Sequence, residues 1–428
     1  MADKRCIAVV SPFLDKRHGT ERCIAEQVER LAHEHGYDVH LYAQRVEDIE
    51  AVEVFGSNDD SPGASNEGAI PRASSAQRGR ILWHRISDLP GPHLVKYVWW
   101  LLANQFRRWR DQRRSGRRYD IIYSAGINCW DADAITVHIV FHDFYHVIRP
   151  ELRLRNTPPP SWLRVMHRLL YYQLLMALER RLYSDPRVML AAVSGVTAEE
   201  LRRVFRREDV QLIHNAVDTR AFNRNARQGR RKGVRSERGY RETDFVLLFM
   251  GNDWKTKGLR SLLEAAGYCR ELPLQVLVVG RDARAPYEAD LQRLGLQPRV
   301  QFALLSAEVM QFYAAADAYV APSLYDSFAL PAVEAMACGL PVIISQRAGV
   351  SELIEDGVDG FVLQDPRDTR ELARQIRLLY DDPALRERLS ENAARTAQCL
   401  SWERNVEETK AFLDCARNRK MKVVWAGR

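Results

Sequence analysis

Residues 317–349 read DAYVAPSLYDSFALPAVEAMACGLPVIISQRAG, and this stretch decides the fold. It opens with a short apolar strand at 318–322, followed by a loop at 323–329. Pro331 then stands where a helix can begin, because its missing N–H and fixed φ suit the first helical turn. The helix is expected to cover 332–338 and to end at Gly339, which tolerates a left-handed cap. Pro341 prevents continuation and the next residues are β-branched, so the stretch predicts one βαβ unit.

The loop of this unit carries the features of an anion site. The N–H groups of Phe328, Ala329 and Leu330 are expected to be unpaired at the helix start and to point into a crevice, where the helix dipole favours an anion. Glu334 lies one turn into the helix, and its side chain leans back toward the same crevice. Glu334 and Asp326, eight residues earlier, suit the hydroxyl groups of a ribose or a sugar. On spacing alone, two solvated acids near a helix start are an equally good interpretation.

Residues 326–343 closely resemble the acid-x7-acid signature of the retaining glycosyltransferases of family 4, which have the GT-B fold. The chain departs from that signature at two positions, where Asp326 stands for a glutamate and Ala329 for a glycine. The resemblance implies an α/β protein with two Rossmann-like domains that face each other across an interdomain cleft. The matching residues are Phe328, Leu330, Glu334, Ala335, Met336, Ala337, Gly339, Pro341 and Val342.

Composition agrees with a folded, multidomain protein. The 428 residues are enough for two or three domains, and 46% hydrophobic with 28% charged residues is ordinary for globular proteins. No stretch reaches the roughly 18 apolar residues of a membrane helix, and the first apolar run is too short for a signal peptide, so we expect a cytoplasmic protein. The seven cysteines form no CxxC pair, which predicts free thiols.

The strand pattern and the resemblance together predict the domain boundaries. Residues 1–222 are expected to form an acceptor-binding domain, in which 56–79, rich in Gly, Ser, Asn and Asp, is a surface insertion. Residues 223–399 are expected to bind the nucleotide sugar. A helix at 400–417 should return to the first domain, as the GT-B resemblance implies, and 418–428 form a basic tail.

The first domain contributes two groups of candidate residues. Gly19 and Thr20 begin its first helix, where a glycine lets an anion approach the backbone. Such glycines are more often plain turns, but the resemblance assigns this position to the donor diphosphate. His138 ends a strand expected at 134–139, and the resemblance places a histidine there near the anomeric carbon of the donor, with His142 as the second candidate. A lone histidine is more often structural.

The second domain is expected to supply the phosphate clamp. The loop 251–258 reads GNDWKTKG and joins a buried strand to a helix, an arrangement typical of phosphate sites. Lys257 matches the clamping lysine of the family, although a solvated turn lysine is the plainer interpretation. Asn252 stands where the family has an arginine, so one positive charge is missing, and Lys255 or Arg281 are candidates to supply it. Some lipopolysaccharide-core glucosyltransferases, which this form resembles, also lack that arginine.

The net charge of +7 is concentrated in two stretches. Residues 96–118 carry the same excess of seven and are interleaved with tryptophans, a combination that suits an anionic membrane surface. A core helix with a solvated end and a binding site for a phosphate-rich acceptor are the alternatives. Residues 223–242 are also rich in arginine. Nucleic-acid binding is disfavoured, because the aromatic residues lie on a helix rather than on an open stacking platform.

A long helix is expected after the basic segment 149–157. Its apolar positions fit a stripe facing the core, although the flanking Arg and Tyr residues could also contact lipid. The stripe consists of Leu163, Met166, Leu169, Leu170 and Leu174.

The sequence thus predicts a retaining hexosyltransferase that uses a nucleotide-diphosphate sugar, with a UDP-sugar favoured. Lys257, Asp326 and His138 are the candidate catalytic residues. The resemblance implies no metal and no cofactor, since the nucleotide sugar is a substrate, and we therefore discount the Asp-x-Asp run at 131–133. The expected acceptor is a lipid-linked or lipopolysaccharide-type glycan at the inner face of the membrane. The alternative is a nucleotide-sugar-binding pseudoenzyme or assembly subunit, because Asn252, Asp326 and Ala329 depart from the pattern.

Overall fold

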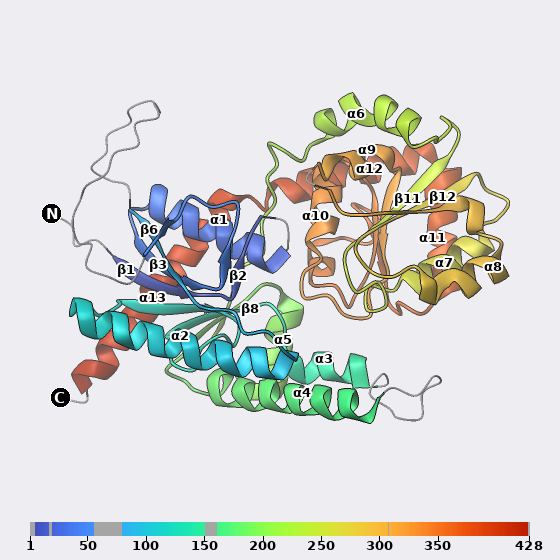
Figure 1. Ribbon diagram of the computed structural model, residues 1–428. Coiled ribbons are helices and arrows are strands. Elements are labelled where there is room, and N and C mark those ends of the chain that lie inside the picture. The colour runs from blue at the N-terminus through green and yellow to red at the C-terminus, as the bar shows by residue number, and fades with distance from the viewer. Residues whose placement is uncertain (1–4, 17–18, 55–78, 150–160, 307, 427–428) are drawn as a thin grey trace.

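The computed structural model describes residues 5–16, 19–54, 79–149, 161–306 and 308–426. The chain forms two parallel sheets with helices packed on their faces, which confirms the predicted α/β class with two Rossmann-like units (Figure 1). Almost all of the expected insertion at 56–79, and the segment 150–157, lie outside the described residues. Strand residues such as Val9, Leu247 and Val278 are fully buried, as expected for parallel sheets covered on both sides.

The first sheet has eight strands and is built around β1. Its helices are α1 (Gly19–His33), α2 (His93–Ser115), α3 (Phe141–Ile148), α4 (Trp162–Tyr183) and α5 (Gly195–Phe205). In sheet order the strands are β10 (Val210–Leu212), β9 (Met189–Ala192), β8 (Ala134–Val137), β7 (Ile121–Ala125), β1 (Cys6–Val10), β3 (Asp38–Ala43), β6 (Ile81–Arg85) and β5 (Val52–Glu53). A small pair is formed by β2 (Phe13–Leu14) and β4 (Arg45–Val46).

The second sheet has six strands and is built around β11. In sheet order they are β13 (Val300–Ala303), β12 (Leu274–Val279), β11 (Phe245–Met250), β14 (Ala318–Ala321), β15 (Val342–Ser345) and β16 (Phe361–Leu363). Its helices are α6 (Arg224–Glu237), α7 (Leu259–Tyr268), α8 (Glu288–Leu294), α9 (Met310–Ala315), α10 (Leu330–Ala337), α11 (Thr369–Asp381) and α12 (Pro383–Gln398). The 3-10 turn η4 (Gly349–Leu353) follows β15.

The strand order fixes where ligands can bind. In the second sheet β11 lies beside β14, and the chain leaves these two strands toward opposite edges of the sheet. In the first sheet β1 lies beside β7 in the same way. Such reversal points leave a crevice at the carboxyl ends of the strands, because the connections on either side diverge there. The loops after β11 and β14 start at this edge, as do the loops that lead to Gly19 and His138.

The decisive stretch folds as β14, loop, α10 and β15, as its sequence predicts. Pro331 lies in the first turn of α10, and Gly339 follows the helix with a φ of 65°. Glycine is needed there because a left-handed residue lets the chain turn directly toward Pro341 and β15.

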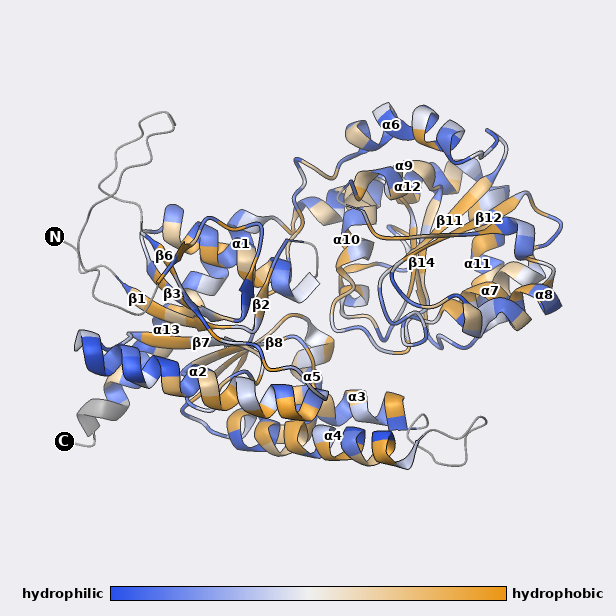
Figure 2. Cartoon of the chain, viewed as in Figure 1, coloured by the Kyte–Doolittle hydropathy of each residue, from blue (hydrophilic) through white to orange (hydrophobic). Residues whose placement is uncertain are grey.

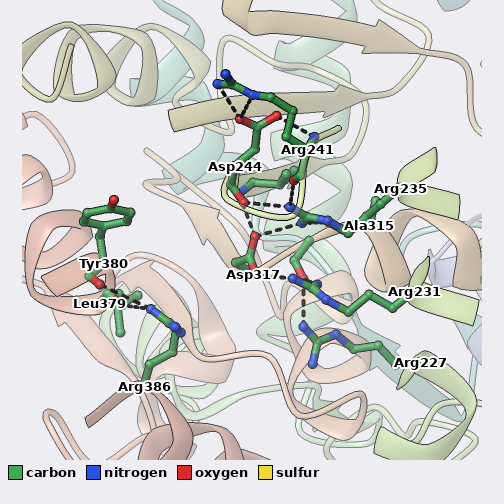
Figure 3. A network of polar contacts seen from close by, with 12 residues as sticks. Arg227, Arg231, Arg235, Arg241, Asp244, Ala315, Asp317, Leu379, Tyr380 and Arg386 are labelled. Atoms are coloured by element: carbon green, nitrogen blue, oxygen red, sulfur yellow. Dashed lines mark hydrogen bonds and ion pairs between the residues drawn. The ribbon is translucent and has the colours of Figure 1, made fainter. Parts of the chain in front are cut away.

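The arginine-rich helix α6 has a structural role. Arg231 and Arg235 form ion pairs with Asp317, with N–O distances of 2.5 and 3.1 Å, and Asp317 also accepts the Val246 amide at 2.8 Å. Arginines of α6, Arg227 among them, donate to the carbonyls that end α9, which the helix itself leaves unpaired (Figure 3). The arginines of residues 223–242 are therefore largely engaged in contacts within the second domain.

The last helix, α13 (Trp402–Ala426), packs against α1, β7 and β9 and so belongs to the first sheet (Figure 1). It is longer than expected, because the residues predicted as a separate basic tail from 418 continue the helix. Arg419 pairs with Asp209 at 3.1 Å and Lys420 with Asp133 at 2.8 Å. These acidic partners, which directly precede β8 and β10, hold the basic end of the helix in place.

The helices α2 and α4 lie side by side and leave apolar side chains exposed. The Leu94 amide donates to His167 at 3.1 Å, and the rings of Tyr97 and Tyr171 pack edge to face. Figure 2 shows hydrophobic residues along both helices and hydrophilic ones at the C-terminal end of α2. None of the described helices is both long and apolar enough to span a membrane. The exposed residues are Val95, Val98, Trp99, Leu102, Phe106 and Trp109 on α2, and Trp162, Leu163, Met166 and Leu170 on α4.

The predicted core stripe of α4 is wrong for three of its five residues, while Leu169 and Leu174 are partly buried. Leu163, Met166 and Leu170 are exposed, and the buried positions include Val165, Leu175 and others further along the helix. Apolar residues occur around most of α4, so periodicity alone could not select the buried face. On α2, Arg108 is fully buried and forms a bidentate ion pair with Asp131, so this basic residue of the cluster and the Asp-x-Asp run stabilise the domain.

We expect Asp317→Ala to lower the free energy of unfolding by about 3 kcal/mol, because it leaves the buried Arg235 and the half-buried Arg231 without their counter-ion. Glu288→Ala is the matched control, since its pair with Arg284 is half-exposed and should contribute less than about 1 kcal/mol. Urea denaturation measures both. Equal losses in the two variants would contradict a structural role for the α6 cluster.

Candidate functional site

A cleft of about 360 Å³ opens between the two sheets, at the edge where both reversal points lie. Its walls come from the start of α1, the end of β8, the loop after β11 and the loop between β14 and α10. The structure brings together in this lining the ten residues predicted as catalytic or substrate-binding: Gly19, Thr20, His138, Asn252, Lys257, Asp326, Phe328, Ala329, Leu330 and Glu334.

Asp326 and Lys257, both in the lining of the cleft, form an ion pair. The other carboxylate oxygen of Asp326, Oδ1, accepts the amides of Phe328 at 3.3 Å and Ala329 at 2.9 Å. The expectation that these amides are unpaired is therefore wrong. The short aspartate side chain folds back onto the amides two and three residues further on, a common use of aspartate in turns. The Leu330 amide is the remaining candidate donor of the three.

Ala329 adopts the left-handed conformation, with φ 67° and ψ 61°. This backbone conformation explains why the family pattern has a glycine at this position, since a Cβ there costs roughly 1–2 kcal/mol. The bond from the Ala329 amide to Asp326 helps to hold the conformation. The two departures from the family pattern are thus in direct contact with each other.

Glu334 is buried, with 3% of its surface exposed, and both of its oxygens are engaged. Arg22 of α1 donates to Oε1 at 2.5 Å, and the hydroxyl of Tyr313 donates to Oε2 at 2.5 Å. Burial lowers the pKa of Arg22, but the Glu334 carboxylate more than offsets this, so the pKa is raised. A carboxylate has about four acceptor positions, so Glu334 retains capacity for ligand hydroxyls.

His138 is buried in the cleft wall with 7% of its surface exposed. Burial lowers its pKa to about 4, so its imidazole is neutral near pH 7. Its Nε2 is buried and has no hydrogen-bond partner among the residues that the structure describes. Such unpaired buried atoms are rare in folded proteins, and a ligand hydroxyl in the cleft would supply the missing partner.

His142, the second candidate, is held elsewhere. Its Nδ1 contacts Glu179 at 2.7 Å, and its Nε2 accepts from Arg180 at 3.1 Å. Glu179 also accepts the amides of Phe141 and His142, at 2.6 and 3.1 Å, and so caps the start of α3. His142 therefore fixes α3 against α4.

Asn252 lies at the rim of the cleft, and its side-chain oxygen accepts the Arg281 amide at 3.1 Å. It adds no charge to the site. Lys255 and Arg281, the two candidates for the missing cation, are exposed and do not belong to the cleft lining. Within the part of the chain that the structure describes, the second cation in the cleft lining besides Lys257 is Arg22, which sequence reasoning missed. Its position three residues after Gly19 was the available signal.

Two further contacts join the domains beside the cleft. The hydroxyl of Tyr325, next to Asp326, accepts the Val140 amide at 3.2 Å and donates to Glu200 at 3.3 Å. Its ring packs against Phe144 of α3, with 5.5 Å between centroids. In addition, Glu352 of η4 contacts His214 at 2.7 Å and the Gly195 amide at 2.9 Å. The loop after β14 is thus tied directly to the first domain.

Comparison with family models gives two adjacent matches. Residues 17–221 match the model described as Glycosyltransferase Family 4, and residues 231–396 match the model described as Glycosyl transferases group 1. The two matches meet near residue 222, between the two sheets, and together they include the whole lining of the cleft.

Curated relatives are similar over part of their length. A glycosyltransferase described as putative, EpsD of Bacillus subtilis, is 29% identical over 258 residues, which are 59% of this chain and 65% of the relative. A D-inositol 3-phosphate glycosyltransferase of Geodermatophilus obscurus is 38% identical over 202 residues, 44% of each chain. The chain therefore spans less than two thirds of the length of these relatives.

Solved structures are similar over nearly the whole chain. WaaG, a glycosyltransferase involved in lipopolysaccharide biosynthesis, superposes with a TM-score of 0.71 at 18% identity and covers 95% of this chain and 98% of its own. Anabaena HepE in complex with UDP-glucose superposes with a TM-score of 0.67 at 19% identity, over 96% and 99%. At this identity the likeness establishes the fold. The two family matches show that the chain belongs to the glycosyltransferases of family 4, and the structural likeness shows that it has the GT-B fold.

Proposed function

We propose that the protein transfers a sugar from a nucleotide-diphosphate donor, with a UDP-sugar favoured, to a glycan acceptor, and that it retains the configuration of the anomeric carbon. The observation that carries this proposal is the pairing of Lys257 and Asp326 beside a neutral, unpartnered His138 in one cleft. A cation beside a hydroxyl-binding acid suits the junction between a diphosphate and its sugar.

Each group has a role in this proposal. Lys257 contacts the β-phosphate and stabilises the charge that develops as the glycosidic C–O bond to that phosphate breaks. Asp326 and the Nε2 of His138 bind sugar hydroxyls, while Glu334 binds the ribose. Asp326 is already held by Lys257 and two amides, an arrangement that positions it for binding rather than for covalent attack.

Retention then follows from attack on the face of the leaving group. The acceptor oxygen forms its bond to the anomeric carbon on the side from which the nucleoside diphosphate departs, and an oxygen of that phosphate takes the acceptor proton. Protein cations are sufficient to bind the leaving group in this scheme, so we propose a reaction without a metal ion or another cofactor.

We further propose that the acceptor is lipid-linked and that the protein binds the anionic inner face of the cell membrane through α2 and α4. Ten large apolar side chains of these two helices are exposed. Exposed arginines, Arg113, Arg114, Arg117 and Arg118, follow at the end of α2. Apolar residues that insert at the headgroup level, together with a basic cluster, are typical of peripheral membrane proteins.

Lys257→Ala should reduce the rate of sugar transfer by about 100-fold or more, because one preorganised donor to the developing charge is lost. The measurement is transfer or donor hydrolysis across a panel of UDP-, GDP- and ADP-sugars. Lys255→Ala, which changes a neighbouring exposed lysine, should keep near-normal activity. Unchanged transfer by Lys257→Ala would remove the clamp from the mechanism, and nucleotide-sugar binding without any turnover by the wild type would favour the pseudoenzyme.

His138→Gln should lower kcat by roughly tenfold to 100-fold while leaving the affinity for UDP, which lacks the sugar, nearly unchanged. The native pKa of about 4 lies below the unfolded value of about 6.5, so the neutral histidine makes stability fall as pH decreases from about 6.5 toward 4. The free energy of unfolding of His138→Gln should therefore fall less than that of the wild type over this pH range. Equal weakening of UDP binding and of kcat would argue against a contact with the sugar.

The combined substitution Leu102→Ser, Phe106→Ser and Trp109→Ser should reduce binding to phosphatidylglycerol vesicles by tenfold or more, because the inserting side chains are lost. Co-sedimentation measures the bound fraction, and binding of the wild type should be weaker with phosphatidylcholine or with high salt. Leu304→Ser, which changes an exposed leucine of the second domain, is the control. Equal binding of the triple variant and the wild type would contradict the proposed surface.

A further inference from the structure

Among the described residues, the cleft lining holds two cations and three acids, and two of the acids are paired with the cations. Lys257 pairs with Asp326, and Arg22 pairs with Glu334. A diphosphate carries more than one negative charge, and the position where the family has a second cation is occupied by the neutral Asn252. Lys257 alone is a single point charge. A second positive group that faces the same space would balance the remaining charge of a diphosphate.

Arg22 is placed to be that group. It lies in the first turn of α1, three residues after Gly19, and lines the cleft with 16% of its side chain exposed. Its guanidinium also lies over the ring of Phe222, 5.9 Å from the centroid. Arg22 pairs with Glu334 through its Nη2 atom. Because a guanidinium has five N–H donors, the same group can bind an acid and a phosphate together.

The position of Arg22 is unfavourable without an anion. The first turn of a helix carries partial positive charge from its unpaired amides, so a cation there is repelled. Glu334 compensates for this in the free protein, although the Tyr313 hydroxyl already holds its second oxygen. A phosphate that approached the amides at Gly19 and Thr20 would be attracted by the same helix start and by the guanidinium together.

We propose that Arg22 is the second diphosphate-binding cation of this protein and replaces the one that is absent at Asn252. This inference rests on the proposed function. Glu334 orients the guanidinium, and Lys257 contacts the diphosphate from the opposite wall. Because Arg22 belongs to the first domain and Lys257 to the second, the diphosphate bridges the two domains and stabilises their relative position.

A purely structural role for Arg22 makes a different prediction. If Arg22 served only to orient Glu334, its loss would weaken every ligand that contains the ribose, with or without a β-phosphate. If Arg22 binds the diphosphate, its loss should weaken the binding of UDP and leave the binding of UMP, which has no β-phosphate, nearly unchanged. A charge restored at the rim of the cleft would then compensate for the loss of Arg22, whereas it could not restore the orientation of Glu334.

The test compares the affinities of UDP and UMP, measured by calorimetry, in wild type, Arg22→Gln, Asn252→Arg and the double variant. We expect Arg22→Gln to weaken UDP binding about 10- to 100-fold, the range of a charge-assisted hydrogen bond, and UMP binding less than threefold. In the Arg22→Gln background, Asn252→Arg should raise the affinity for UDP at least tenfold. Arg281→Gln, at an exposed arginine outside the lining, should leave both affinities unchanged.

Arg22→Lys keeps a positive charge beside Glu334 and serves if Arg22→Gln does not fold. Arg22→Lys should weaken UDP binding severalfold and leave UMP binding nearly unchanged. Adding Asn252→Arg should again raise the affinity for UDP. Equal losses for UDP and UMP, an unchanged UDP affinity, or no restoration by Asn252→Arg would overturn the inference. If the wild type binds none of UDP, GDP and ADP, the proposed function fails first, which distinguishes the two failures.

Discussion

The cleft depends on the pairing of buried charges. Asp326 and Glu334 are both more than 90% buried, and an ionised carboxylate in such a place is costly unless a cation and hydrogen bonds compensate. Lys257 compensates the first and Arg22 the second. Because Arg22 comes from the other domain, this requirement also holds the two sheets against each other. An entering anionic substrate must share or replace these partners, so binding and domain arrangement are physically linked.

The two departures from the family pattern have one physical origin. Ala329 must adopt a left-handed conformation so that the chain can enter α10, and a Cβ makes this conformation costly. Asp326 is short enough to accept the Phe328 and Ala329 amides and thereby stabilises the same turn. In the family pattern, a glycine at position 329 adopts the left-handed conformation at little cost, so the glutamate at position 326 is not needed to stabilise the turn. The aspartate is therefore a structural cap as well as a member of the cleft.

Local patterns determined most of what the sequence could predict. The βαβ unit at 317–349 was predictable because Pro331 and Gly339 specify its turns through backbone geometry alone. Most residues of the cleft were predictable, because they occupy characteristic positions in strand-loop-helix units, which parallel strands bring to one edge, and because the family resemblance selected Gly19, His138 and Lys257 among them. The GT-B fold followed from the same positions through the family resemblance.

Non-local contacts could not be predicted in this way. Arg22 and Glu334 are 312 residues apart, and nothing in either local sequence indicates the other. The capping of two amides by Asp326 depends on the exact reach of one side chain. The exposed face of α4 was missed because leucine, methionine and tyrosine occur around most of this helix. The extension of α13 depends on acids at 133 and 209, which only the folded sheet brings close to it.

The helix α3 provides a physical connection between the exposed face of α2 and α4 and the cleft. It begins three residues after His138, and the buried Glu179 of α4 accepts two amides of its first turn. At its other side, Phe144 packs against Tyr325, the neighbour of Asp326. A shift of α4 would therefore displace α3 and, through Tyr325, the loop that holds Asp326. Because packed side chains transmit displacements with little compression, these contacts link the position of α4 to the loop that holds Asp326.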